Sequence, residues 1–320
     1  MNWVKKKKLS MIKAIQYNGH PCIKLEELWN ALHNLFNLAQ NQYIDPDLLD
    51  KISDKKVTRW SLFSKAEIID TINKYNNSST SGLDKLSWRH LKKILKNEEC
   101  INKLIDIANN CIDLGHWLSH FKTLTTVIIS KPNKVFYNSI KSFYPIVLLN
   151  TTRKLFEKMI GKQLQFSTIS NNFIHLCQLD RLKYRSTTDV GVALTHFIQS
   201  DWIKNLYTST IVFDIAQFFL FLNYHLLSFI LNKVEFNQKF LTFFSNYLVN
   251  RKTKYLWNNF SSPLCNVDVG VSQELAFSPI LSILYLSPIF YIFEKHLKNL
   301  NIPISVLLFV DNGWTLHFSE

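Results

Sequence analysis

An acidic turn interrupts an apolar stretch near the C-terminus, and this pattern constrains the fold more than any other part of the sequence. Residues 306–310 and 314–318 are mostly apolar, and Asp311, Asn312 and Gly313 separate them. Asn and Gly tolerate the positive φ of tight hairpin turns, so the pattern predicts a β-hairpin with Asp311 at its turn. A carboxylate fixed by two buried strands suits a metal ligand in phosphoryl transfer. Alternatively, Asp311 only forms the turn, because Asp is an ordinary turn residue.

A second carboxylate follows another predicted strand earlier in the chain. Residues 208–213 are Thr, Ser, Thr, Ile, Val and Phe, a composition typical of strands, and Asp214 comes next. We expect this strand to be buried as well. Between the two carboxylates, residues 269–281 predict a loop that leads into a helix, with Ser278 as N-cap and Pro279 as first helical residue. Two carboxylates at strand ends are therefore the first functional hypothesis.

Six short motifs occur in a fixed order along the chain. They are KPNK at 131–134, FYPIVLLN at 143–150, QLDRLKYRSTT at 178–188, FDIAQFF at 213–219, GVSQELAFSPIL at 270–281 and FVDN at 309–312. This order closely resembles the reverse transcriptase domain of non-LTR, LINE-like retrotransposons, particularly the fungal ones. The resemblance covers residues 80–320, because residues 81–88 are similar to an element that precedes the fingers in that family. One such motif is weak support, but six in order are specific.

The resemblance implies an α+β right-hand polymerase fold, with fingers and a palm whose antiparallel sheet is backed by helices. Asp214 and Asp311 would be ligands of two Mg²⁺ ions, and Asn312 would occupy the place of a further catalytic carboxylate. The chemistry agrees with these roles, because hard cations prefer carboxylate oxygens. Two such ions activate the primer 3′-hydroxyl and neutralise the triphosphate.

Three further residues would contact the incoming nucleotide if the resemblance holds. Phe219 would lie under the sugar and disfavour a 2′-hydroxyl, Gln273 would contact nucleotide or template, and Lys131 would contact phosphate. The expected partners are thus an RNA template, a DNA primer and deoxynucleoside triphosphates. Nothing in the sequence indicates a protein partner.

Several departures from the family pattern fall on the same expected site. Asn312 offers a neutral oxygen where the family has Asp, Glu274 replaces a glycine that lets substrate approach, and Tyr144 replaces an arginine. Asp180 and Leu182 also depart from a glycine-rich segment. Because losing one fixed electrostatic partner costs on the order of 10² to 10³ in rate, two such losses would lower activity by about 10⁴ or more.

We therefore expect an RNA-directed DNA polymerase domain with impaired catalysis. The alternatives are a nucleic-acid-binding remnant with no enzymatic role and a remnant that does not fold stably. The resemblance ends at the hairpin, so a thumb, an endonuclease and an RNase H domain are expected to be absent. The net charge of +13 favours a polyanionic partner, although drift in base composition would also enrich lysine.

The sequence gives little support for a membrane or secreted protein. Residues 275–293 carry no formal charge and approach spanning length, but two prolines and three serines interrupt them. We expect instead a helix buried behind the palm sheet, and a protein that is intracellular, nuclear or cytoplasmic. The five cysteines form no C-x-x-C pair, which favours reduced thiols over a zinc site or a disulfide framework.

We expect four regions along the chain: an N-terminal helical extension at 1–60, a helical linker at 61–122, fingers at 123–205 and an incomplete palm at 206–320. Within the fingers, a helix is predicted at 151–164 with Arg153, Lys154, Lys158 and Lys162 on its solvent side. Within the palm, helices are predicted at 224–233 and 240–248. The basic residues 251–254 are expected either to follow a nucleic-acid backbone or to form a solvated turn.

Overall fold

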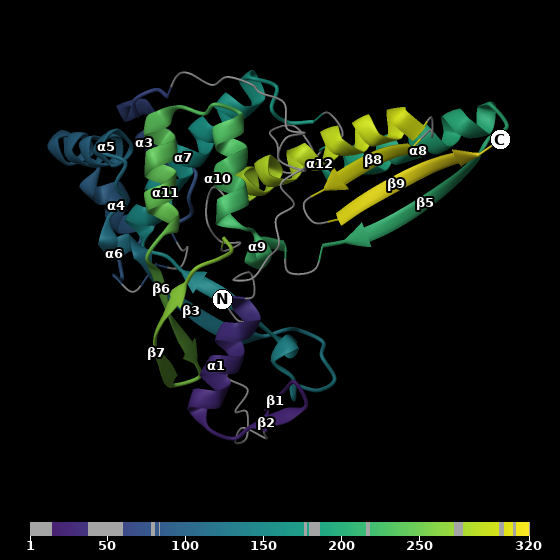
Figure 1. Ribbon diagram of the computed structural model, residues 1–320. Helices are drawn as coiled ribbons and strands as arrows, with labels where there is room; N and C mark the ends of the chain where they lie inside the picture. The colour runs from purple at the N-terminus through teal and green to yellow at the C-terminus, as the bar shows by residue number, and fades with distance from the viewer. Residues whose placement is uncertain are drawn as a thin grey trace.

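The protein has a mixed α+β architecture (Figure 1). The computed structural model describes residues 15–37, 60–77, 81–82, 84–175, 178, 186–215, 218–271, 278–300, 304–309 and 312–319. For residues 293–300, 304–309 and 312–319 the description is limited to the backbone. The two main sheets of this part of the chain lie at different ends of the molecule, and helices connect them.

The first sheet has four strands in the order β4-β3-β6-β7. Its strands are β3 (Thr123–Ser130), β4 (Phe143–Leu148), β6 (Arg251–Trp257) and β7 (Phe260–Val267). β3 pairs antiparallel with β4 and parallel with β6, whereas β6 and β7 form an antiparallel hairpin. The sheet therefore joins strands from both sides of the expected boundary between residues 205 and 206.

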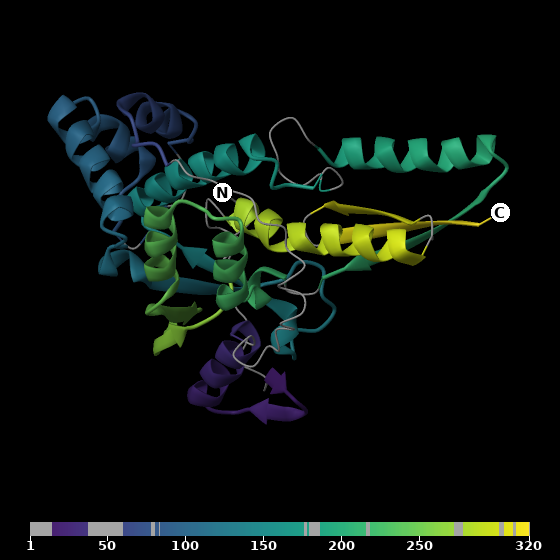
Figure 2. The same cartoon turned by 45° about the horizontal axis from the view of Figure 1, so that its top comes forward.

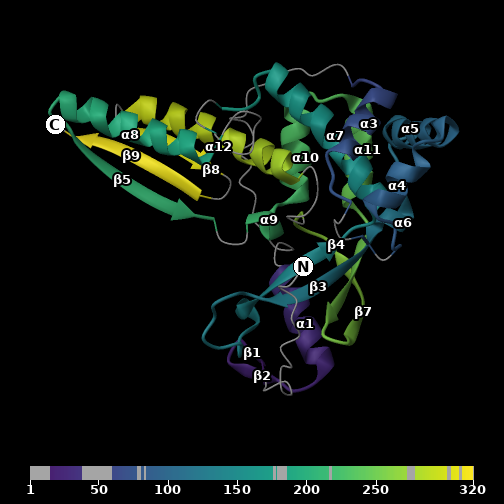
Figure 3. The same cartoon turned by 180° about the vertical axis from the view of Figure 1, so that it is seen from behind.

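The second sheet has three antiparallel strands in the order β5-β9-β8. It consists of β5 (Tyr207–Asp214), β8 (Ile304–Phe309) and β9 (Asn312–Ser319). The helices α8 (Thr187–Ile203) and α12 (Ser278–Leu300) run alongside this sheet, as Figures 1 and 3 show from opposite sides. The strand at 208–213 and the antiparallel pairing of the strands on either side of residue 311 are thus confirmed, but Asn312 and Gly313 belong to β9 and not to the turn. The expected helix is present as α12, and the residues just before Ser278 lie outside the described part of the chain.

A layer of helices lies beside the four-stranded sheet (Figure 2). The buried side chains of these helices belong to the main core. The helices are α3 (Lys65–Asn73), α4 (Trp88–Ile94), α5 (Glu98–Asp113), α6 (Ser119–Lys122), α7 (Thr151–Ser170), α9 (Phe218–Phe221), α10 (Tyr224–Lys233) and α11 (Gln238–Leu248). Side-chain caps define several starts: Ser64 accepts from the Glu67 amide, and Asn97 accepts from the amides of Glu99 and Cys100. Aromatic stacking ties the layer together, as between Trp60 and Phe240 with centroids 4.6 Å apart.

The N-terminal residues form a smaller unit against the four-stranded sheet. It consists of the hairpin β1 (Ile15–Tyr17) and β2 (His20–Cys22) and of α1 (Leu25–Phe36), and the 3-10 helix η2 (Ile140–Ser142) lies against it. Asn18 and Gly19 form the hairpin turn, both with positive φ. The leucines of α1 pack onto Tyr255 and Trp257 of β6 in a second core.

Three expectations about exposure are wrong. β5 is not buried, because Ile211 and Val212 on its two faces are 65% and 62% exposed. The strand pairs only with β9 among the described strands and therefore lies at the edge of its sheet. Residues 251–254 do not form a turn, because they begin β6, with Arg251 and Thr253 buried and Lys252 and Lys254 exposed.

Arg153 is the third correction, because it is buried in α7 and does not face solvent. Its Nε donates to the Glu157 carboxylate at 2.7 Å, and a second nitrogen donates to the Phe121 carbonyl. The Tyr247 hydroxyl of α11 donates to the same Glu157 oxygen at 2.9 Å. A buried carboxylate one turn away explains the difference, because it compensates the guanidinium charge.

The predicted helix 151–164 extends to Ser170, and the helix at 224–233 is confirmed.

Within the described part of the chain, no helix is long and apolar enough to cross a membrane. α12 is instead buried along its first half, where Leu281, Ile283 and Leu284 are at most 2% exposed. It is fixed to a distant segment through Gln178, which donates to the Ile283 carbonyl at 3.0 Å and accepts from Ser287 at 2.7 Å. The apolar composition of this helix thus reflects protein packing.

Candidate functional site

The strand register brings Asp214 next to the hairpin turn. Asp214 pairs with Asn312 across β5 and β9, and Asn312 also pairs with Phe309 across β9 and β8. Asp214 is exposed at the end of β5. Asp311 lies outside the described residues, but its neighbour in the chain, Asn312, occupies the strand position beside Asp214. The two strand ends named from the sequence therefore lie at the same end of one sheet.

The described residues do not by themselves form a metal centre. No group of three or more His, Cys, Asp or Glu side chains that would hold a metal ion is found among them. Asp214 supplies a carboxylate of the kind Mg²⁺ prefers, but a two-ion site needs more oxygen ligands than one side chain offers. Gln273, Glu274, Asp180 and Leu182, like Asp311, lie outside the described part of the chain.

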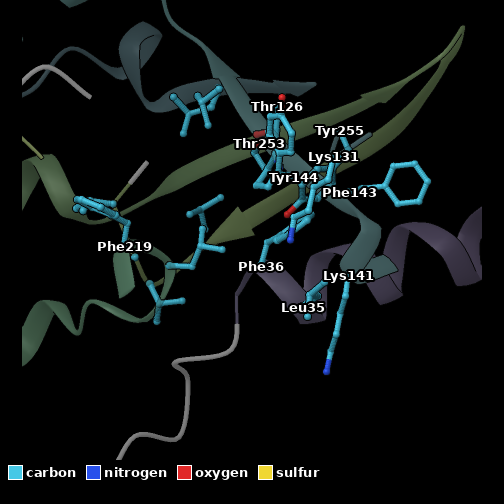
Figure 4. A pocket seen from close by; sticks show the side chains of 18 residues that line it. Leu35, Phe36, Thr126, Lys131, Lys141, Phe143, Tyr144, Phe219, Thr253 and Tyr255 are labelled. Atoms are coloured by element: carbon cyan, nitrogen blue, oxygen red, sulfur yellow. The ribbon is translucent and has the colours of Figure 1, made fainter. Parts of the chain in front are cut away.

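A pocket of about 400 Å³ lies where the four-stranded sheet meets α9 and α1 (Figure 4). Three of its lining residues were named from the sequence: Lys131 and Phe219 for contacts with a nucleotide, and Tyr144 as the residue that replaces an arginine of the family pattern. Lys131 follows β3, Tyr144 lies in β4, and Phe219 lies in α9 with only 2% of its surface exposed. Much of the remaining wall is formed by Thr126, Thr253 and aromatic rings from α1, β4 and β6: Phe36, Phe143 and Tyr255.

Lysines provide the positive charge of this pocket. The backbone of Lys131 is fixed, because its amide donates to the Ser142 carbonyl at 2.9 Å and its carbonyl accepts from the Tyr137 hydroxyl at 2.6 Å. No hydrogen bond or ion pair ties its ammonium group to another described residue. Lys141 also lines the pocket, and its side chain extends away from the other labelled side chains in Figure 4. Two lysines without carboxylate partners favour an anionic ligand.

Another part of the pocket wall depends on a glycine. Gly270 has φ of +70°, and a Cβ at this position would lie 2.6 Å from the Leu220 carbonyl oxygen. Its amide donates to the Leu222 carbonyl at 3.1 Å, and the Val271 amide donates to the Phe219 carbonyl at 2.7 Å. The segment therefore lies directly against α9, which only a residue without a side chain permits.

Arg251 is a residue of this region that the sequence reasoning missed. It is 1% exposed, its Nη2 donates to the Gly270 carbonyl at 2.8 Å, and its guanidinium lies 4.8 Å from the Tyr224 ring centre. Burial, with the positive charge of Arg153 as a second cause, lowers the pKa of Arg251 to about 9. Arg251 is separated from the apolar residues Tyr255 and Trp257 by even numbers of residues, so all three share one face of a strand. This spacing is the signal that would have indicated an inward-facing side chain.

The pocket combines an apolar, partly aromatic wall with two lysines, a lining that suits a flat ring attached to an anionic group. Tyr144 contributes a neutral side chain where the resemblance expects a cation, so the charge of the site rests on Lys131 and Lys141.

No protein-family model matches this sequence, and a search of curated proteins gives no match.

Proposed function

We propose that this protein is a reverse transcriptase-type RNA-directed DNA polymerase domain, of the kind found in non-LTR retrotransposons, with impaired catalysis. The observation that carries the proposal is the pocket shared by Lys131, Tyr144 and Phe219. Lys131 follows β3 and Tyr144 lies in the next strand, β4, whereas Phe219 in α9 is far from both in the chain. The family resemblance places all three positions near the incoming nucleotide. A shared cavity is what that assignment requires.

The pairing of Asp214 with Asn312 supports the same proposal. Two-metal nucleotidyl transfer needs carboxylates from neighbouring strands at one end of a sheet. The end of β5 leads within a few residues to α9 (Figure 1), and Phe219 of α9 lines the pocket. When bound, Mg²⁺ would activate the primer hydroxyl and neutralise the triphosphate, with Asp214 among its ligands.

Each lining residue then has a role that follows from its chemistry. Lys131 and Lys141 attract the triphosphate, and the buried ring of Phe219 forms the surface under the sugar. Gly270 and Arg251 hold the backbone close to α9 and fix the width of the pocket. Tyr144 provides no positive charge, and Asn312 provides no carboxylate, so binding is expected to exceed turnover.

A second candidate function is nucleic-acid binding without catalysis. The neutral Tyr144 beside Lys131 favours it, because the pocket keeps its apolar walls and loses charge where the triphosphate would develop negative charge. This alternative predicts affinity for RNA that falls as salt rises, since each neutralised phosphate releases counterions. It also predicts that no substitution at the site restores synthesis.

Primer extension on an RNA template, with Mg²⁺ or Mn²⁺, separates the two functions. The native chain is expected to give no detectable product, and a triple variant carrying Asn312→Asp, Glu274→Gly and Tyr144→Arg is expected to gain synthesis. Single reversions are expected to help little, because residues of one site act as a unit. The matched control adds Asp214→Asn to the triple variant and is expected to abolish the gain.

Vigorous synthesis by the native chain would refute the impaired catalysis. A folded triple variant that binds RNA and stays inert would favour the binding function. A Lys131→Gln variant that binds a fluorescent deoxynucleoside triphosphate as tightly as the native chain would show that the pocket is not the nucleotide site.

A further inference from the structure

A second cavity, of about 300 Å³, lies between α3 and α7. It is lined by Thr71, Lys74, Tyr75, Lys158 and Lys162, and it shares no lining residue with the pocket at Lys131. Three lysines thus converge from two packed helices on one small space. The polymerase function proposed above gives this cavity no role.

The charges around this cavity do not balance. Lys74 and Lys162 both donate to the Asp70 carboxylate, at 2.9 and 2.8 Å. Lys162 also donates to the Thr71 hydroxyl at 2.7 Å, whereas Lys158 has no carboxylate partner within the described residues. Three ammonium groups against one carboxylate leave two positive charges without compensation.

Lys158 is the least favourably placed of the three. Its side chain is half-buried in α7, and burial lowers its pKa, with the charges of Lys162 and Lys74 as further causes. A cation in such a place is destabilising until an anion approaches, because it has lost water and gained like-charged neighbours. The Asp70 carboxylate is already shared by the other two lysines and does not relieve it.

Tyr75 also lines the cavity, and its ring is held in place. The ring of Tyr75 stacks on Trp88 of α4, with centroids 3.8 Å apart and planes 4° from parallel. Burial raises the pKa of Tyr75, with the Glu157 charge as a second cause, so its hydroxyl stays protonated and able to donate. A rigid ring therefore holds this donor beside the lysines.

We propose that this cavity binds a phosphate group, which is held by the ammonium groups of Lys158 and Lys162 and by the Tyr75 hydroxyl. Phosphate accepts several charge-assisted hydrogen bonds at once, which matches a site with several donors and one carboxylate. The volume equals that of roughly ten waters of liquid, enough for a phosphate with part of its hydration shell. The same chemistry is found in free phosphate and in the backbone of a nucleic-acid strand.

The first test is a titration with inorganic phosphate at constant ionic strength, read by calorimetry and by the melting temperature of the full chain. The native protein is expected to bind saturably, and Lys158→Gln is expected to bind about tenfold more weakly or worse. Lys103→Gln is the matched control, because it removes the same charge from an exposed lysine of α5 and is expected to change nothing.

Two measurements distinguish a variant that loses phosphate binding from a variant that loses its fold. Lys158→Gln removes an uncompensated charge, so in chloride buffer it is expected to melt at the same temperature as the native chain or higher. Asp70→Asn acts in the opposite direction, because it removes the competing carboxylate, and it is expected to bind phosphate more tightly. Lys103→Gln changes the net charge of the protein by the same amount as Lys158→Gln, so a difference in phosphate affinity between these two variants excludes a general effect of net charge.

A second titration with a short single-stranded RNA identifies the source of the phosphate. If it belongs to a strand, Lys158→Gln lowers the salt dependence of RNA binding by about one phosphate contact. If only inorganic phosphate binding is lost, the ligand is a small phosphate. The proposal is overturned if phosphate binding does not saturate, or if Lys158→Gln and Lys103→Gln bind it equally.

Discussion

The four-stranded and three-stranded sheets have similar apolar sequences but very different surroundings. In β3, Leu124 and Ile128 are 3% and 5% exposed, whereas Ile211 and Val212 in β5 are 65% and 62% exposed. β3 is an inner strand with a partner on each side, and β5 is an edge strand that pairs only with β9 among the described strands. The comparison teaches that β-branched composition predicts a strand but does not predict how much stability the strand contributes.

The largest expected effect concerns the buried ion pair that joins the helical layer beside the four-stranded sheet. Glu157→Gln leaves the buried Arg153 charge without a carboxylate, so the free energy of unfolding is expected to fall by about 3–5 kcal/mol. The measurement is chemical denaturation of the full chain. Glu99→Gln, which breaks the exposed pair with Lys103, is the control and is expected to cost less than about 1 kcal/mol. Equal losses in the two variants would contradict the buried role.

The second prediction tests the close contact between Gly270 and α9. Gly270→Ala is expected to cost about 2 kcal/mol or more, since it adds left-handed strain and a contact with the Leu220 carbonyl. Gly19→Ala is the matched control, because it also has positive φ but open space around its Cβ. It is expected to cost only the strain, about 1–2 kcal/mol. Denaturation midpoints of both variants separate the two contributions, and identical midpoint shifts would rule out the contact.

The third prediction compares the two sheets directly with one chemical change. Ile128→Val in β3 removes a buried methyl group and is expected to cost about 0.5–1.5 kcal/mol. Ile211→Val in β5 is expected to change the free energy of unfolding by less than about 0.5 kcal/mol. Hydrogen exchange is expected to follow the same order, with slower exchange in β3 than in β5. If the two variants lose equal stability, the contrast between the sheets fails.

The smallest expected effect is a dependence on pH where α1 packs on β6. Burial lowers the pKa of His33, whose ring contacts the Tyr255 hydroxyl at 3.2 Å, while the Asp268 charge acts in the opposite direction. The unfolded chain therefore binds a proton more readily than the folded one, so stability is expected to fall as pH decreases below about 6.5. Unfolding measured at pH 7 and pH 5 is expected to show a smaller fall in His33→Gln than in the native chain. An unchanged fall would place the proton uptake at another group.

Several elements could be predicted from local sequence because their signals are local. The hairpin of β8 and β9, the strand that ends at Asp214 and the helix Tyr224–Lys233 all follow from residue type and periodicity. Exposure could not be predicted in the same way, because it depends on partners from elsewhere in the chain. Arg153 was expected to face solvent. The Glu157 carboxylate on the same helix compensates its charge, and the Tyr247 hydroxyl of a distant helix donates to that carboxylate inside the core.

The candidate site could likewise be predicted only in part from the sequence. The sequence named Lys131, Tyr144 and Phe219, and the structure places them around one pocket. The sequence analysis included Arg251 among the basic residues 251–254 but did not predict its burial, because a basic residue near two lysines has the composition of a solvated segment. Only the pairing of β6 with β3 turns that side chain inward, and this pairing joins segments that the periodicity of either one cannot connect.

The parallel pairing of β3 with β6 also has a consequence for how the chain is made. Thr123 pairs with Lys252, so one edge of β3 stays without its partner until the ribosome has synthesised residues well beyond 250. Closing so long a loop delays folding, because the chain loses conformational entropy before the stabilising contacts between β3 and β6 form. During that interval an apolar strand with an open edge is exposed to other nascent chains, and translation speed and chaperone supply become determinants of yield.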